Sequence, residues 1–128
     1  LQMNIQELQF LVRERIPVKI VVLNNTALGM IRHFQEMYFE SNYYFTVEKE
    51  GYSTPDFVKV AQAYGISAKK VINIDAMKDI SFEADYPELL EVILPGDTYV
   101  LPKLEFGKPN QDQEPLIDRS LYNYLMEL

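Results

Sequence analysis

Residues 18–35 read VKIVVLNNTALGMIRHFQ, and this stretch decides the fold class. An apolar run ends in two adjacent asparagines, Asn24 and Asn25, and a helical pattern begins shortly after them. A continuous apolar run, rather than an alternating one, is typical of a strand in a parallel sheet that is covered on both faces. The stretch therefore predicts a buried strand over residues 19–24, a polar turn, and a helix over residues 28–39.

The rest of the chain continues this alternation of strands and helices. Asn4, followed three residues later by Glu7, forms a capping-box pattern ahead of a first helix. A later helix is expected to have Thr54 as its cap and Pro55 at its first position, and to stop at Gly65. The other predicted elements are strands over residues 70–74 and 89–94, a short helix over 75–80 and a last helix over 118–128. This order predicts an α/β fold with a mostly parallel central sheet flanked by helices.

Length and charge limit the class of protein. The 128 residues are one domain's worth, so a single domain over residues 1–128 is expected, with a proline-rich, extended and irregular segment at 95–117. The net charge is −7, and the chain from Asp75 onward contains twelve acidic residues and four basic ones. Because a basic patch is missing, nucleic acid is not an expected partner.

Membranes and secretion are not expected either. No apolar run reaches the ~20 residues that a transmembrane helix needs. The first residues, LQMNIQELQF, lack a basic stretch ahead of an apolar one, and the chain has no cysteine. These features predict a cytoplasmic protein without a signal peptide or disulfides.

The asparagine pair stands where an open α/β sheet binds its ligands, beyond the carboxyl end of a strand. Asparagine supplies a neutral oxygen, and Mg²⁺ prefers oxygen ligands from side chains, backbone carbonyls and phosphates. Gly29 lets the backbone turn closely into a helix whose N-terminal N–H groups can face an anion. The residues are thus compatible with a magnesium and phosphate site, but on spacing alone an Asn-Asn turn after a strand is more often only a turn.

Several motifs in order resemble one family. The segments LQMNIQEL, VKIVVLNN, LGM, FQ and PDFVKVAQAYG together look like the C-terminal cofactor domain of thiamine-diphosphate-dependent enzymes, closest to the acetolactate synthase (acetohydroxyacid synthase) large-subunit family. The resemblance covers about residues 1–94 and implies the thiamine-diphosphate-binding fold. The family's motif begins with Gly-Asp-Gly, which would lie ahead of Leu1, so the chain is expected to be an N-terminally truncated fragment of a longer enzyme.

The resemblance assigns roles to residues after the strand. Asn25 corresponds to the family's Mg²⁺ ligand, and Ala27 would give its backbone carbonyl to the same ion. Phe34 takes the place of a tryptophan that selects the acceptor ketoacid, which makes it a candidate for the substrate pocket, with simple core packing as the alternative. The backbone that would wrap the diphosphate belongs to Leu28, Gly29 and Met30. No catalytic residue is expected in this fragment.

The resemblance also implies an activity. The longer enzyme would bind thiamine diphosphate and Mg²⁺, decarboxylate pyruvate, and join the two-carbon unit to a second 2-ketoacid. It would work as a homodimer or homotetramer, and any FAD of the longer chain would bind outside this domain. The alternatives are an enzyme of the pyruvate oxidase or decarboxylase type, and a non-catalytic α/β interaction module that kept the fold.

Overall fold

The computed structural model describes residues 1–78, 80–81, 83–102 and 105–128. The chain divides into two compact units, Leu1–Thr98 and Tyr99–Leu128. The first unit contains the sheet and the asparagine pair, and the single domain over residues 1–128 stays a prediction. Among the described residues, no helix is both long enough and apolar enough to cross a membrane.

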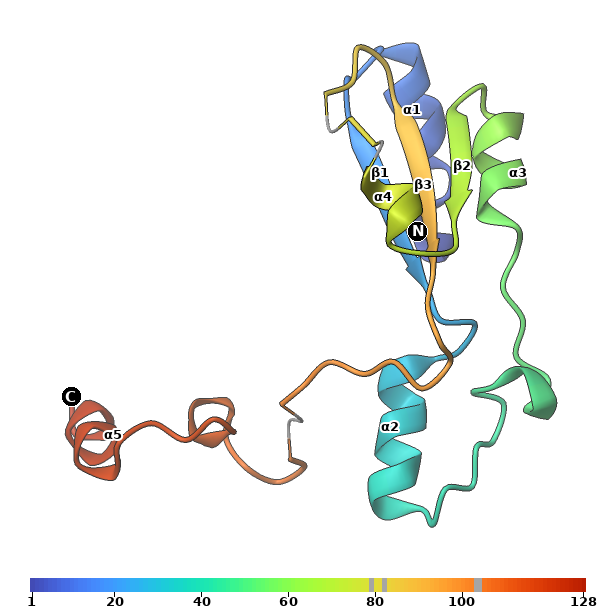
Figure 1. Cartoon of the computed structure of the whole chain (residues 1–128). Helices are drawn as coiled ribbons and strands as arrows, with labels where there is room; N and C mark the ends of the chain where they lie inside the picture. Colours follow the sequence, from blue (N-terminus) through green and yellow to red (C-terminus); the bar gives the residue numbers. More distant parts are fainter. Residues whose placement is uncertain (79, 82, 103–104) are drawn as a thin grey trace. The chain divides into compact units, whose positions relative to one another are not determined.

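The first unit is built on a parallel sheet (Figure 1). Its strands are β1 (Lys19–Asn24), β2 (Ser67–Val71) and β3 (Glu88–Ile93), in the order β1-β3-β2. The last strand in the sequence is therefore the central one. This arrangement confirms the predicted α/β class and the mostly parallel sheet.

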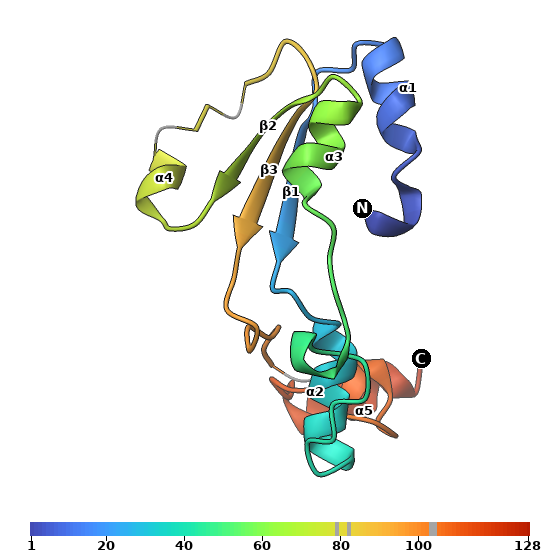
Figure 2. The same ribbon diagram turned by 90° about the vertical axis from the view of Figure 1, so that its right-hand side faces the viewer.

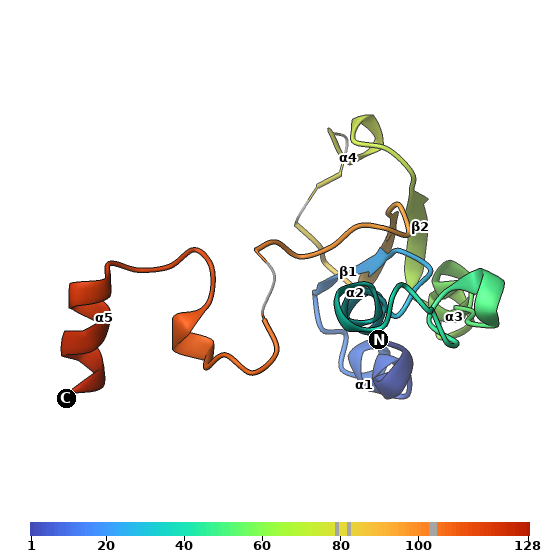
Figure 3. The same cartoon turned by 90° about the horizontal axis from the view of Figure 1, so that it is seen from below.

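Helices pack on both faces of this sheet. Helices α1 (Glu7–Arg13) and α3 (Phe57–Ala63) lie on one face, and the short helix α4 (Asp75–Lys78) lies on the other (Figures 2 and 3). Helix α2 (Gly29–Tyr38) follows β1 and lies beyond the carboxyl ends of the strands rather than alongside them (Figure 1). The turn between β1 and α2 is therefore at the edge of the sheet where parallel folds bind ligands.

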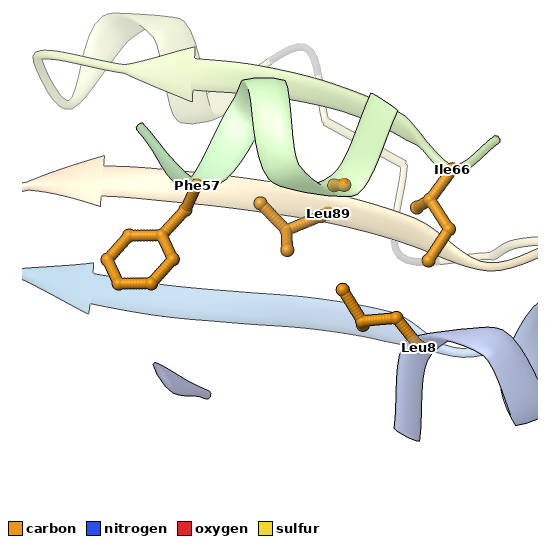
Figure 4. Packing of buried hydrophobic residues seen from close by; sticks show 5 residues of the cluster. Leu8, Phe57, Ile66 and Leu89 are labelled. Atoms are coloured by element: carbon orange, nitrogen blue, oxygen red, sulfur yellow. The ribbon is translucent and has the colours of Figure 1, made fainter. Parts of the chain in front are cut away.

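The main core lies between the sheet and the two helices on the first face (Figure 4). Leu89 from the central strand is fully buried there. The residues that pack around it are Leu8, Phe57, Ala61 and Ile66. A smaller cluster on the opposite face contains Val71, Ile80 and Leu90. Burial of these apolar side chains is the main force that stabilises the unit.

One prediction about β1 is wrong. Its apolar run was expected to be covered on both faces, but Val21 and Leu23 are 44% and 68% exposed. Successive side chains of a strand point to opposite faces, so Ile20 and Val22 reach the main core while Val21 and Leu23 point to the other face. On that face the described helix α4 packs near β2 and β3, as its contact residue Met77 shows.

The second strand is also displaced from its predicted place. Strand β2 covers Ser67–Val71 instead of residues 70–74, and Ile72 and Ile74 are 71% and 79% exposed. Gly65 ends the preceding helix with φ of +82°, as predicted, and the chain enters the strand almost directly after it. The apolar residues that suggested the later position lie beyond the last strand pair, Val71 with Val92.

Two predicted helix caps are wrong. Thr54 does not cap α3, because the helix begins at Phe57 and Asp56 is its cap, accepting a hydrogen bond from the Lys59 N–H at 3.0 Å. An aspartate satisfies a free N–H of the first turn at least as well as a threonine does. Helix α1 begins at Glu7 without a side-chain cap, since the preceding residues Gln2–Asn4 form a short 3₁₀ helix.

The second unit contains α5 (Arg119–Met126), which is close to the predicted last helix. Asp118 caps it by accepting a hydrogen bond from the Leu121 N–H at 3.0 Å. A 3₁₀ turn at Asn110–Asp112 precedes it. The side chain of Gln113 connects the start of α5's leading segment to residues 105–108. It accepts a hydrogen bond from the Glu105 N–H at 2.7 Å and donates one to the Lys108 carbonyl at 3.1 Å.

Candidate functional site

The two asparagines form consecutive side-chain turns at the end of β1. Oδ1 of Asn24 accepts a hydrogen bond from the Thr26 N–H at 2.9 Å, and Oδ1 of Asn25 accepts from the Ala27 N–H at 3.3 Å. Thr26 adopts a left-handed conformation with φ of +52°, which is uncommon for a residue with a branched Cβ. The amides thus bend the chain sharply between the strand and the helix.

Gly29 makes room for this bend. A Cβ atom at position 29 would lie 2.7 Å from Nδ2 of Asn25, a distance that real Cβ atoms essentially never show. Glycine therefore allows the Asn25 side chain to lie against the start of α2. The first N–H groups of a helix have no partner within the helix and carry partial positive charge, so this is a suitable place for an anion.

A loop fixes the other side of the turn. The Leu28 N–H donates to the Thr46 carbonyl at 2.9 Å, and the Thr46 hydroxyl donates to Oε1 of Gln35 at 2.6 Å. Thr46 and Gln35 are both buried. The start of α2 is therefore held by a residue that follows the helix, and sequence reasoning did not identify Thr46.

The segment after β3 backs the asparagine turn. The Leu94 N–H donates to the Asn24 carbonyl at 2.9 Å, which extends the pairing of β1 with β3 to the end of the strand. The guanidinium of Arg32 on α2 donates to the Gly96 carbonyl. A Cβ atom on Gly96 would make only ordinary contacts, 3.5 Å from the carbonyl oxygen of Asn25 and 3.5 Å from the Arg32 guanidinium.

A buried carboxylate lies beneath the turn. Nδ2 of Asn24 donates to Oε1 of Glu91 at 2.7 Å, and Nζ of Lys70 lies 3.5 Å from Oε2 of the same carboxylate. Glu91 is 1% exposed in the middle of the central strand, and Asn24 is 6% exposed. Sequence reasoning missed Glu91, although a charged residue inside the apolar run LLEVIL was a visible signal.

The structure places five of the predicted site residues in one short turn at the start of α2; these are Asn25, Ala27, Leu28, Gly29 and Met30. The Met30 side chain is 84% exposed, so it does not serve the core of this unit. Phe34 lies one turn further along α2, and its ring packs against those of Tyr38 and Phe39, with centroids 4.8 Å and 5.8 Å apart. Phe34 is half-buried.

The chemistry of this turn fits a hard cation that also binds phosphate. The turn offers the amide oxygen of Asn25 and the backbone carbonyl of Ala27, which are the kind of ligands that Mg²⁺ takes. Within the described part of the chain, no three His, Cys, Asp or Glu side chains gather closely enough to hold a metal ion. A cation here would therefore depend on neutral oxygens of the turn and on oxygens of a bound anion. A small, half-open pocket next to the turn is lined by Thr26, Glu48, Tyr52, Ser53 and Thr54.

Comparison with known proteins identifies the family of this domain. Residues 1–92 match the family described as "Thiamine pyrophosphate enzyme, C-terminal TPP binding domain", where thiamine pyrophosphate is thiamine diphosphate. The chain is 36% identical over 117 residues to acetolactate synthase 2, chloroplastic, of Zea mays, covering 86% of this chain and 18% of the relative. It is 34% identical over 113 residues to the acetolactate synthase isozyme 2 large subunit of Escherichia coli (strain K12), covering 86% and 20%.

A third relative is the acetolactate synthase large subunit of Pyropia yezoensis, with 35% identity over 112 residues that cover 85% of this chain and 19% of the relative. The chain thus spans about a fifth of the length of these relatives. The match covers the asparagine turn and all of the sheet except Ile93. On this ground, the chain belongs to the family of C-terminal thiamine-pyrophosphate-binding domains of thiamine pyrophosphate enzymes.

Proposed function

We propose that this chain is the cofactor-binding domain of an acetolactate synthase-like enzyme. The enzyme would decarboxylate pyruvate and ligate the two-carbon unit to a second 2-ketoacid. The observation that carries the proposal is the asparagine turn at the end of β1, which lies within the family match and is shaped by Gly29. The identity to three acetolactate synthases supports the choice of reaction.

In this proposal the turn binds the diphosphate end of the cofactor. The Asn25 amide oxygen and the Ala27 carbonyl would hold Mg²⁺, whose charge would offset that of the diphosphate. The backbone of Leu28, Gly29 and Met30 lies along the diphosphate, and the N-terminus of α2 adds its favourable field. Thiamine diphosphate, when bound, supplies the chemistry that lets carbon dioxide leave a 2-ketoacid and a new carbon–carbon bond form.

Phe34 is our candidate for the wall of the acceptor pocket. It follows the turn on α2, and its half-buried ring is steadied by two neighbouring aromatic rings. Such a ring offers a flat apolar surface that favours some side chains of the second ketoacid over others. Phenylalanine has no indole N–H, so selection at this position would depend on shape and apolar contact.

The site would be completed by residues outside these 128. We propose that the enzyme is a homodimer or homotetramer, as the family resemblance implies. We also propose that it is located in the cytoplasm. Any FAD would bind in another part of the enzyme. Sedimentation of the longest natural chain that contains this sequence would measure its oligomeric state.

The test is product analysis on that longest natural chain. Pyruvate, thiamine diphosphate and Mg²⁺ are supplied, and acetolactate and carbon dioxide are measured together. Both products support the proposal. Carbon dioxide without acetolactate would move the protein to the pyruvate oxidase or decarboxylase type. No binding of thiamine diphosphate at all would favour the non-catalytic module.

A further inference from the structure

The buried carboxylate of Glu91 is not one of the proposed ligand residues, yet it accepts a hydrogen bond from Asn24 in the turn that carries them. It is 1% exposed, and it lies on the strand that is paired on both sides. Its register partners are Val22 on β1 and Lys70 on β2. Burying a carboxylate costs free energy unless its partners compensate. Stabilisation of the fold alone is therefore a poor explanation for a glutamate at this position.

The hydrogen bond from Asn24 gives Glu91 a specific task. Glu91 accepts from Nδ2 of Asn24 at 2.7 Å, while Oδ1 of the same amide accepts from the Thr26 N–H at 2.9 Å. A carboxylate can only accept hydrogen bonds, so it selects the orientation of the amide that points the NH₂ group inward. That orientation leaves the oxygen on the Thr26 side, where it closes the turn.

Lys70 brings a positive charge close to the Glu91 side chain. Its ammonium lies 3.5 Å from Oε2 of Glu91, and its side chain is 44% exposed. The lysine therefore keeps part of its contact with water while its ammonium group lies near the buried side chain of Glu91. An exposed lysine could also turn away into solvent without leaving a buried charge of its own.

We propose that Glu91 is a positioning residue for the cation site. It fixes the amide of Asn24, the Asn24 amide closes the turn at Thr26, and the closed turn carries the proposed ligand residues Asn25 and Ala27. The inference rests on the proposed function, since it assigns a role in the binding of Mg²⁺ and thiamine diphosphate. Groups that orient metal ligands typically change metal affinity about 10- to 100-fold when they are removed.

The experiment compares two substitutions in the longest natural chain that contains this sequence. Glu91→Leu removes the acceptor, whereas Glu91→Gln keeps an oxygen for Nδ2 of Asn24 and lets Lys70 turn toward solvent. Binding of Mn²⁺, as the probe for the cation site, is followed by electron paramagnetic resonance with thiamine diphosphate present. Deuterium uptake of the peptide that contains Thr26 is measured without metal and cofactor.

The control is a second ion pair on the same strand. Nζ of Lys19 lies 2.5 Å from Oε2 of Glu88, at the opposite end of β3 from the asparagine turn. Glu88→Gln weakens this pair and should leave Mn²⁺ affinity and uptake at Thr26 unchanged. If Glu91→Leu does not fold, Asn24→Ser is the second variant, because serine offers an acceptor to Thr26 but cannot donate an amide N–H to Glu91.

We expect Glu91→Leu to weaken Mn²⁺ binding at least about tenfold and to raise uptake at Thr26, and Glu91→Gln to stay within about threefold of the original affinity. Unchanged affinity in Glu91→Leu, or an equal loss in Glu91→Gln, would overturn the positioning role. If the original protein itself binds neither Mn²⁺ nor thiamine diphosphate, the proposed function fails. In that case, deuterium uptake of the peptide that contains Thr26 alone tests whether Glu91 holds the turn. Higher uptake in Glu91→Leu would support this role, and unchanged uptake would overturn it.

Discussion

The side chain of Asn25 fills space that residue 29 leaves only because it is glycine. A Cβ atom there would lie 2.7 Å from Nδ2 of Asn25. The clashing atom is the end of a side chain and not backbone, so the amide would move aside while the turn and α2 remain. The same amide is the proposed Mg²⁺ ligand. A substitution at position 29 should therefore change the affinity for the cation without a comparable loss of folding stability.

Gly29→Ala is therefore expected to weaken Mg²⁺-dependent binding of thiamine diphosphate by roughly tenfold, equivalent to about 1.4 kcal/mol. Thermal stability should hold or rise slightly, because alanine is a better helix former than glycine. Calorimetric titration and a thermal melt measure the two effects. Gly96→Ala is the matched control, since its Cβ would make ordinary contacts at 3.5 Å on the other side of the same turn.

Asn25→Ala removes the proposed ligand directly. We expect the Mg²⁺ concentration at half-maximal activity to rise at least about tenfold in the longest natural chain, since one oxygen ligand is lost. The control is Asn42→Ala, an exposed asparagine whose amide donates to the Phe39 carbonyl. An unchanged dependence on Mg²⁺ in Asn25→Ala would show that the asparagine pair is only a turn.

Phe34→Trp tests the acceptor pocket. A larger ring should change the ratio of products when two acceptor 2-ketoacids of different side-chain length compete, while the rate of carbon dioxide release from pyruvate stays close to the original. The reason is that Phe34 is proposed to contact the second substrate only. A product ratio equal to that of the original protein would assign Phe34 to packing with Tyr38 and Phe39.

Asp56 gives the stability a dependence on pH. The backbone N–H of Lys59 donates to its carboxylate and holds the pKa of Asp56 below its usual value of 3.8. Because the folded pKa is the lower one, the stabilisation is complete above the unfolded pKa and is lost as pH falls through the folded pKa. Thermal melts from about pH 6 to about pH 2 should show a smaller acid-induced loss in Asp56→Asn, which caps without titrating.

Leu89→Ala tests the core of the first unit. Leu89 is 0% exposed on the central strand, and truncation of such a leucine costs about 2–5 kcal/mol of the free energy of unfolding. Chemical denaturation measures the loss. Leu116→Ala is the control, because Leu116 is 49% exposed and its truncation should change that free energy by less than about 0.5 kcal/mol.

The sequence was a good guide where local signals and burial agreed. Strand β1 occupies residues 19–24 as predicted, because its apolar run is bounded by a proline-containing segment and by the asparagine pair. Strand β2 was placed three residues too late, since the apolar residues Ile72 and Ile74 look buried in sequence but are exposed. Their exposure depends on where the strand pairs with β3, and pairing is not a local property.

The candidate site shows the same division. The turn residues from Asn25 to Met30 could be named from the sequence, because they are adjacent and have a recognisable order. Glu91 and Thr46 could not, since Glu91 is 67 residues from Asn24 and Thr46 is 18 residues from Leu28 along the chain, and strand register and loop closure bring them to the turn. The sequence showed only a single charged residue inside an apolar strand. It did not show that Asn24 is the hydrogen-bond partner of this residue.

The order of the strands has a consequence for how the domain is made on the ribosome. Strands β1 and β2 do not touch in the sheet, because β3 lies between them and is the last to be synthesised. Strand β1 can pair only after β3 has been synthesised, because the register partner of Lys19 is Glu88, which lies 69 residues later in the chain. At about 5–20 residues per second, the apolar strand β1 stays unpaired for several seconds of translation. Nascent chains that stall before residues 88–93 have left the ribosome should accordingly be bound by chaperones, and chains that stall after this point should be released.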